Sequence, residues 1–201
     1  MASQPNIFLT AEGYLDIEEK AEYKSEFFDG EMFAMSGVSR VHDIIAGNVF
    51  ATVHSQLKGS PCHAHTSDMR VAVSPTRAYV YPDLSIACKD AKYIRRGTDT
   101  LLNPVAIIEV LSPTTELHDR GKKFKRYKGI ASLKEYVLIS QDEILVERFL
   151  RQDTGGDWLY SSFTNLDDSL VLAAAPATLK LRDVYDGVFP AVGDRITEVA
   201  D

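Results

Sequence analysis

The segment PVAIIEVLSPTTELHDRGKKFKRY, residues 104–127, decides the fold class of this chain. Its first part, PVAIIEVL, is apolar and rich in β-branched residues, which is typical of a buried strand. Ser112-Pro113 ends the strand, and the basic residues that follow predict a helix from about Thr115 to Lys128, ended by Gly129. A buried strand followed directly by a helix is typical of domains that pack helices on a sheet.

Upstream of this segment the sequence predicts a helix, a hairpin and a second helix, in that order. Thr10 is a candidate N-cap for AEGYLDIEEK. Asp29-Gly30 lies between aromatic and apolar residues, and this dipeptide is the strongest short-range signal for a hairpin turn. Ser39 can cap the second helix, whose apolar residues recur every three to four positions until Gly59 ends it.

Most of the remaining segments predict strands. Ser74–Arg77 separates two extended segments, and Lys89–Asn103 predicts a loop. EYVLIS and EILVERFL predict a second hairpin around Gln141-Asp142, with an edge strand at Glu143–Leu150 that could pair with another copy. WLYSSFT and SLVLAA predict further strands, and LRDVYDGVF a short closing helix. This order predicts an α/β (α+β) fold, with a central mixed sheet flanked by helices and an N-terminal helix and hairpin.

Length and composition indicate a soluble globular protein. The chain has 201 residues, 45% of them apolar and 25% charged, which suits a single domain spanning residues 1–201. No apolar run approaches the roughly 20 residues that span a bilayer, and no secretory signal is visible. Cys62 and Cys88 show neither metal-ligand spacing nor a disulfide framework. We therefore expect a cytoplasmic protein that does not enter a membrane.

The charge is unevenly distributed along the chain. The net charge is −7, which excludes a protein that coats nucleic acid by bulk attraction. Residues 119–128, however, contain six basic residues and one acidic residue, so the rest of the chain carries −12. The basic segment is either a local anion site or a solvated helix face.

Two carboxylates lie in apolar surroundings. Glu109 shares a strand face with Ile107 and Leu111, and Asp83 follows Pro82, which marks a strand edge or bulge. A buried charge costs several kcal/mol unless it is neutralised. On neighbouring strands the two carboxylates could hold one Mg²⁺, which proteins bind through one or two carboxylates plus waters and phosphate. The alternative is that each pairs with an internal Arg or Lys.

The basic helix offers a cation for the same site. A projection at 100° per residue places Leu117, Gly121 and Phe124 on the inward stripe, with Lys123 at its edge. Lys123 is therefore the lysine best placed to approach the end of the Glu109 strand. The alternative is a boundary lysine whose stem covers apolar surface.

The order of these motifs resembles one large prokaryotic family. DGEMFAMSG, a histidine at position 42, SDMRV, YPDLSIAC, the segment at residues 104–127 and SLKEYVLIS occur as in the Uma family of restriction-endonuclease-like proteins. The resemblance covers about residues 5–190, and EVLSPTTE…DRGKKFKRY is its most specific part. That family is similar to the PD-(D/E)XK nucleases, which have a central mixed sheet flanked by helices.

The resemblance implies a set of site residues. Asp83 supplies the first acidic metal ligand, Glu109 the second, and the backbone carbonyl of Val110 a further one. The lysine of the nuclease motif is expected at position 111, where this chain has Leu111. Lys123 on the following helix matches the lysine that the family uses instead.

The same resemblance implies an activity. It predicts a Mg²⁺-dependent endonuclease, with Mn²⁺ as an alternative ion, that hydrolyses phosphodiester bonds in DNA as a homodimer, since two strands need two sites. Auxiliary candidates are Glu31, His42 and Tyr127. Candidates for binding nucleic acid are Arg120, Lys122 and Arg126, of which the helical projection points the last two away from the core.

Two further interpretations remain open. One is a catalytically silent nucleic-acid-binding or dimerisation module that keeps the same fold, because fold alone does not secure function. The other is a structural ion pair between Lys123 and Glu109 without activity. Two carboxylates and a lysine favour the enzyme, because a pure binding module gains nothing from acidic groups that face phosphates.

Overall fold

The computed structural model describes residues 8–35, 37–113, 116–153 and 156–188, so the predicted helix start at Thr115 lies outside it. In spatial order, the central sheet contains β12 (Trp158–Phe163), β11 (Val146–Arg151), β10 (Glu135–Ser140), β9 (Ala106–Leu111), β6 (Leu84–Ala87) and β3 (His63–Thr66). A second sheet contains β2 (Glu31–Ala34), β1 (Ser25–Phe28), β5 (Ala78–Val80), β4 (Arg70–Ser74), β8 (Thr98–Leu101) and β7 (Tyr93–Arg96). The remaining elements are the helices α1 (Ala11–Glu18), α2 (Arg40–Leu57), α3 (Phe124–Tyr127) and α4 (Leu181–Val184), the π-helix η1 (His118–Lys123), and the strand pair β13 (Ser169–Val171) and β14 (Thr178–Lys180).

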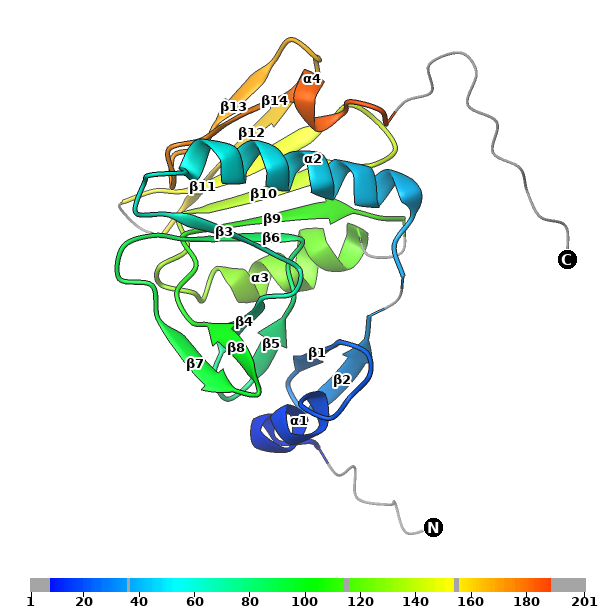
Figure 1. The fold of residues 1–201 in the computed structure, drawn as a ribbon, viewed down its shortest axis with the longest axis vertical. Coiled ribbons are helices and arrows are strands. Elements are labelled where there is room, and N and C mark those ends of the chain that lie inside the picture. Colours follow the sequence, from blue (N-terminus) through cyan, green and yellow to red (C-terminus); the bar gives the residue numbers. More distant parts are fainter. Residues whose placement is uncertain (1–7, 36, 114–115, 154–155, 189–201) are drawn as a thin grey trace, which may run out of the picture.

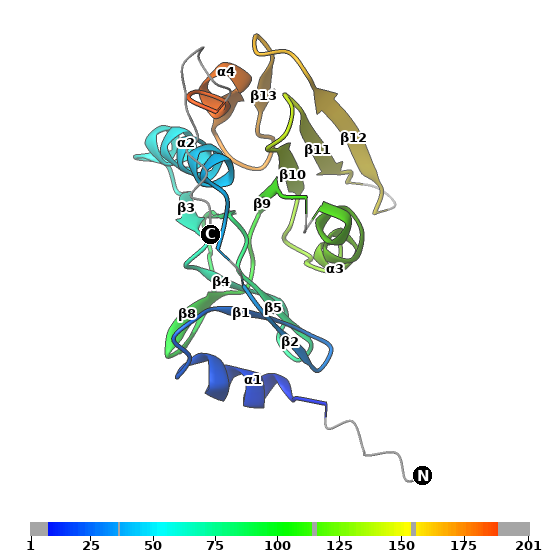
Figure 2. The same ribbon diagram turned by 90° about the vertical axis from the view of Figure 1, so that its right-hand side faces the viewer.

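The central sheet is mixed and has helices on both faces. Strands β9 and β10 pair in parallel, whereas the other neighbouring strands of this sheet are antiparallel. Helix α2 lies on one face of the sheet, and α3 lies on the other (Figures 1 and 2). The predicted fold class, a mixed sheet flanked by helices with an N-terminal helix and hairpin, is therefore confirmed.

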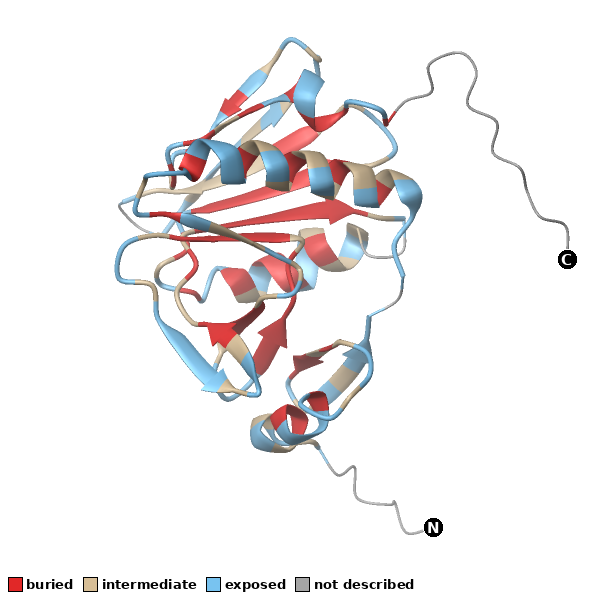
Figure 3. Cartoon of the chain, viewed as in Figure 1, coloured by how far each residue is buried: buried red, intermediate tan, exposed pale blue. Residues whose placement is uncertain are grey.

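Strand β9 is buried along its whole length, as are the strands beside it (Figure 3). Its side chains alternate between the two faces: Ile108 and Val110 belong to the core that α2 covers, and Ile107 and Leu111 belong to the core around α3. This alternation points Glu109 toward η1 and α3.

Several local signals in the sequence act as predicted. Thr10 and Ser39 are the N-caps of α1 and α2, and the Ser39 hydroxyl accepts the backbone N–H of His42 at 3.1 Å. Asp29 and Gly30 turn between β1 and β2 with φ of 50° and 99°. Two consecutive positive φ angles are what a tight hairpin turn of this kind requires.

The basic helix departs from the sequence prediction. Leu117 is 89% exposed and Gly121 is exposed, so the predicted inward stripe is wrong at both positions. The reason is that η1 is π-helical, and its i→i+5 hydrogen bonds widen the turn and shift which side chains face inward. Asp119, Lys123 and Tyr127 are the buried polar residues of this segment.

Two strand predictions are also corrected. Lys89–Asn103 is not a plain loop, because it contains the hairpin of β7 and β8, which turns at Gly97 with φ of 62°. The segment Glu143–Leu150 does not form a sheet edge, because β11 pairs with β10 on one side and β12 on the other. On this side of the central sheet the edge strand is β12, whose pairing the sequence does not reveal.

Cys62 and Cys88 form a disulfide, which the sequence pattern did not indicate. They lie one position beyond the paired residues His63 and Ala87, so the bond joins the chain before β3 to the end of β6. Among the described helices none is both long and apolar enough to cross a membrane.

The disulfide gives a stability prediction. Its cysteines are 26 residues apart, and cross-linking a loop of that size restricts the unfolded chain. We expect Cys88→Ser to lower the free energy of unfolding by about 2–4 kcal/mol, measured by urea denaturation without reductant. Free-thiol titration of the folded wild type should find no thiol until reductant is added. Two reactive thiols in the untreated protein would contradict the pairing.

Candidate active site

Asp83 and Glu109 lie next to each other at the neighbouring ends of β6 and β9. Asp83 directly precedes β6, which pairs with β9 in antiparallel register. The backbone N–H of Asp83 donates to Glu109 Oε2 at 3.3 Å, and the backbone N–H of Val110 donates to Asp83 Oδ2 at 2.8 Å. The sequence expectation that these two carboxylates meet on adjacent strands agrees with this geometry.

Lys123 lies within ion-pair distance of three carboxylates. Its Nζ is 2.9 Å from Glu109 Oε1, 3.1 Å from Glu26 Oε1 and 3.6 Å from Asp119 Oδ1. The side chain is only 8% exposed. Burial alone lowers the pKa of the Lys123 ammonium, but the surrounding carboxylates outweigh this effect and raise that pKa well above its usual value. Lys123 is therefore a fixed positive charge.

Glu109 is the most deeply buried carboxylate of this group. Burial raises the pKa of Glu109, Lys123 opposes the rise, and the negative charges of Asp119, Asp83 and Glu26 add to it, giving about 8. The phenol of Tyr127 donates to Glu109 Oε1 at 2.8 Å. Burial and the charge of Glu109 raise the pKa of Tyr127 well above its usual value, so the phenol stays a hydrogen-bond donor.

His42 contacts the other carboxylate from the first turn of α2. Its Nε2 is 3.3 Å from Asp83 Oδ2, and its Nδ1 is buried without a hydrogen-bond partner. Burial lowers the pKa of His42, but the hydrogen bond to Asp83 and the nearby negative charges outweigh it and raise that pKa above its ordinary value. His42 therefore contacts the same Asp83 oxygen, Oδ2, that accepts the backbone N–H of Val110.

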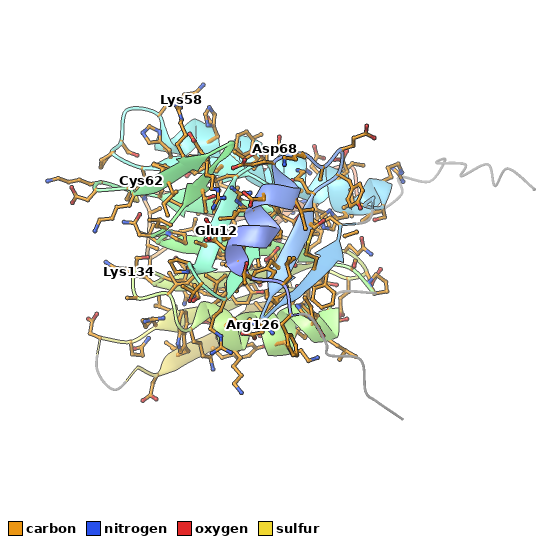
Figure 4. All side chains as sticks on the ribbon, turned by 90° about the horizontal axis from the view of Figure 1, so that it is seen from below. Glu12, Lys58, Cys62, Asp68, Arg126 and Lys134 are labelled. Carbon is orange, nitrogen blue, oxygen red and sulfur yellow. A yellow bond between two sulfur atoms is a disulfide. The ribbon has the colours of Figure 1, made fainter. Side chains whose placement is uncertain are left out.

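These groups line one cavity of about 580 Å³, except for Tyr127, which is fully buried behind it. We call Glu26, Asp83, Glu109, Asp119 and Lys123 the acidic centre. Glu31 lies at the cavity rim on β2, and Lys122 and Arg126 line the cavity as well, although the projection pointed them away. Arg126 reaches from α3 toward the β1–β2 hairpin, where it meets Asp29 at 3.3 Å (Figure 4).

Arg120 is placed differently from the other two basic candidates. It is not among the residues that line the cavity. Its guanidinium is held by Glu116 at 2.7 Å and by Glu147, so its charge is already compensated within the fold. A role for Arg120 in binding nucleic acid has no support from this geometry.

Two members of the acidic centre were not predicted from the sequence. Asp119 stands four residues before Lys123, and this i,i+4 acid–base spacing was a usable signal. Glu26 lies on β1 beside Phe27 and Phe28. It is almost a hundred residues from Lys123 along the chain, and no local pattern links the two.

The donor set fits a hard divalent cation. Five carboxyl groups and three cationic side chains line the cavity, which leaves two negative charges when every carboxyl is ionised and the histidines are neutral. Within the described ranges no group of three or more His, Cys, Asp or Glu side chains is placed to hold a metal ion. Mg²⁺ does not need one, because one or two carboxylates suffice when waters and phosphate oxygens fill the remaining positions.

A comparison with solved structures supports the fold. The fold matches the crystal structure of "a putative nuclease belonging to DUF820" from Anabaena variabilis, with a TM-score of 0.72 and 19% identity. The match covers 90% of this chain and 99% of that one. The fold is thus restriction-endonuclease-like, as the resemblance implied.

The chain belongs to the Uma2 family, described as "Putative restriction endonuclease", whose sequence model matches residues 11–182. It is 32% identical to an uncharacterised protein of Synechocystis sp. over 186 residues, which cover 92% of this chain and 96% of the relative. A second uncharacterised protein of that strain is 33% identical over 141 residues, covering 70% and 80% of the two chains. The family predicted from the motifs is therefore confirmed.

Proposed function

We propose that this protein is a metal-dependent endonuclease that hydrolyses phosphodiester bonds in DNA. The observation that carries the proposal is the convergence of Asp83, Glu109 and Lys123 in one cavity. The family description and the nuclease named among the structural matches support the same class of activity. We propose that the protein acts in the cytoplasm, where its DNA substrate is.

The proposed metal ligands are oxygens of the acidic centre and its backbone. Asp83, Glu109 and the carbonyl of Val110 would hold Mg²⁺ or Mn²⁺. When bound, the ion supplies the positive charge that polarises a phosphodiester and lowers the pKa of water. Through its contact with Asp83, His42 keeps that carboxylate oriented.

The chain's own cations act on the phosphate. Lys123 orients the attacking water or stabilises the charge that develops on the phosphate, because it is a fixed positive charge beside the ligands. Tyr127 on α3 holds Glu109 in place through its hydrogen bond, and Asp119 on η1 holds Lys123 in place through their ion pair. Lys122 and Arg126 contact the neighbouring phosphates. In-line attack leaves 5′-phosphate and 3′-hydroxyl ends.

The two rival interpretations, a catalytically silent binding module and a purely structural ion pair, differ from the nuclease in whether the cavity binds a metal ion and whether DNA is cut. The Lys123–Glu109 ion pair exists at 2.9 Å, so the pair alone does not distinguish the interpretations. The surplus of carboxyl groups distinguishes them, because with neutral histidines the cavity stays negative even while Glu109 holds its proton, and it repels phosphate until a cation binds. Metal binding at Asp83 is therefore the decisive property.

The experiment is a calorimetric titration of Mn²⁺ into wild type, Asp83→Asn and Asp43→Asn. Asp43 is exposed on the same helix as His42 and does not line the cavity, so it is the matched control. We expect Asp83→Asn to bind Mn²⁺ at least tenfold more weakly, and Asp43→Asn to match wild type. Supercoiled plasmid and single-stranded circular DNA should be cut only with metal and only by the two proteins that bind it.

Equal Mn²⁺ binding in all three proteins would eliminate the proposed metal site. Metal binding without cleavage of either DNA would favour the silent module. The homodimer stays a prediction, and sedimentation of the same samples distinguishes it from a 22.3 kDa monomer.

A further inference from the structure

The cavity has a second side that the proposed chemistry does not use. Phe28, Phe33, Met35 and Val38 line it, and we call these four residues the apolar wall. Phe33 is 47% exposed, and Met35 and Val38 are exposed as well. Apolar side chains gathered at the surface of a cavity mark a place where an apolar part of a ligand binds.

The apolar wall lies next to the acidic centre. Phe33 on β2 is directly opposite Glu26 on β1, and Glu26 is the carboxylate 3.1 Å from Lys123. Side chains directly opposite each other on antiparallel strands have Cβ atoms only about 5 Å apart. A phosphate held at the acidic centre therefore brings its own nucleotide within reach of the Phe33 ring.

The aromatic rings of this side pack against one another at tilted angles. The Phe28 ring centroid is 6.0 Å from that of Phe33 and 5.5 Å from that of His118, and the Arg126 guanidinium lies 4.3 Å above Phe28. Phe28 itself is buried, which leaves Phe33 as the exposed ring. Exposed aromatic rings stack bases of any sequence, because every base has a π-face.

The charges of the site are unsuited to continuous duplex. Affinity for duplex DNA grows with the number of phosphates that Lys and Arg neutralise. Among the described residues that line the cavity, the cationic side chains outside the acidic centre are Lys122 and Arg126, and Arg126 is shared with Asp29. The reacting groups Glu109 and Lys123 lie buried at the cavity floor. In a paired duplex the bases are stacked inside the helix, so no base face is exposed for contact with the apolar wall.

We propose that the apolar wall stacks an unpaired base, so that the substrate of this site is single-stranded DNA. The inference rests on the proposed nuclease function and specifies its substrate class. Phe33 is the residue that makes the stacking contact, and the phosphate beside the stacked base is the one that the acidic centre receives.

The test measures DNA binding apart from cleavage. Fluorescence anisotropy is recorded for a labelled 12-nucleotide single strand and for its duplex in Ca²⁺, with a gel confirming that both stay intact. We expect the single strand to bind at least tenfold more tightly than the duplex.

Phe33→Ala should weaken single-strand binding about 5- to 100-fold, since base stacking is worth about 1–3 kcal/mol, whereas Phe33→Trp should retain it. The control Tyr23→Ala removes an aromatic ring that is 65% exposed but outside the cavity, and should change nothing.

Equal affinity for single strand and duplex, or no effect of Phe33→Ala, would overturn the inference. Mn²⁺ titration of Phe33→Ala tests the single-strand inference separately from the proposed nuclease function, because this variant should bind the metal as wild type does. If Phe33→Ala lost Mn²⁺ binding too, the ring would support the acidic centre rather than a base, and the inference would be wrong. If the nuclease proposal alone failed, single-strand binding would still depend on Phe33 while no DNA was cut.

Discussion

Replacing Lys123 with methionine is expected to lower the free energy of unfolding by about 3–5 kcal/mol and to slow DNA cleavage by about 10²- to 10⁴-fold. The loss of stability follows from the contacts of Lys123 with Glu109, Glu26 and Asp119, all within 4 Å. Without the lysine these buried carboxylates have no cation among them. Removing one partner of a buried ion pair is costly because the other charge stays buried.

The loss of stability should depend on pH in a defined direction. Lys123 opposes the raised pKa of Glu109, so in the variant burial and the neighbouring negative charges raise that folded-state pKa above its wild-type value of about 8. The unfolded glutamate is ionised above its ordinary pKa of 4.5, so both proteins lose stability as pH rises toward 8, but only the variant continues to lose it above that pH. Urea denaturation at pH 6 and pH 9.5 should show the larger difference from wild type at pH 9.5.

Lys125→Met is the matched control for this prediction. Lys125 lies two residues further along the same helical segment, is exposed and does not line the cavity. Surface substitutions of this kind change stability by no more than about 0.5 kcal/mol. If Lys123→Met were as stable as Lys125→Met at pH 9.5, the ionised form of Glu109 would not depend on the charge of Lys123, and the prediction would be wrong.

Periodicity and turn signals in the sequence predicted much of the framework that positions the site. Ser39 caps the helix that carries His42, and Asp29-Gly30 turns the hairpin that carries Glu26. The two-residue period of β9 correctly placed Glu109 on a buried face. Each of these features depends on residues that are close in sequence, which is why a single chain reveals them.

The features that the sequence did not predict depend on long-range contacts or on irregular backbone. The π-helical turn of η1 brings Asp119 and Lys123 inward, and a projection at α-helical spacing cannot anticipate it. Glu26 joins the acidic centre only because the two sheets pack together. The disulfide of Cys62 and Cys88 depends on the register of β3 against β6. A contact between residues that are far apart in the chain produces no recurring residue pattern in the sequence, so sequence periodicity cannot predict it.

The affinity of the metal-free protein for Mn²⁺ is expected to rise about 50-fold between pH 6 and pH 8 and by no more than about twofold above pH 8. Burial raises the pKa of Glu109 to about 8, so below that pH the carboxyl holds a proton that a metal ion must displace. Displacing one proton changes the apparent affinity about tenfold per pH unit while the pH is below the pKa. The metal-free protein should also lose stability across this window, since the unfolded glutamate is already ionised there.

Calorimetric titration of Mn²⁺ at pH 6, 7, 8 and 9, in two buffers that differ in ionisation enthalpy, measures both the affinity and the protons released. Close to one proton should be released per ion at pH 7, and almost none at pH 9. Glu109→Gln should bind weakly with little pH dependence, whereas Glu22→Gln, an exposed carboxylate outside the cavity, should reproduce the wild-type curve. A flat affinity between pH 6 and pH 8 would mean that the Lys123 charge, 2.9 Å away, outweighs burial and keeps Glu109 ionised. In that case the acidic centre would be fully charged at neutral pH, and metal binding there would need no deprotonation.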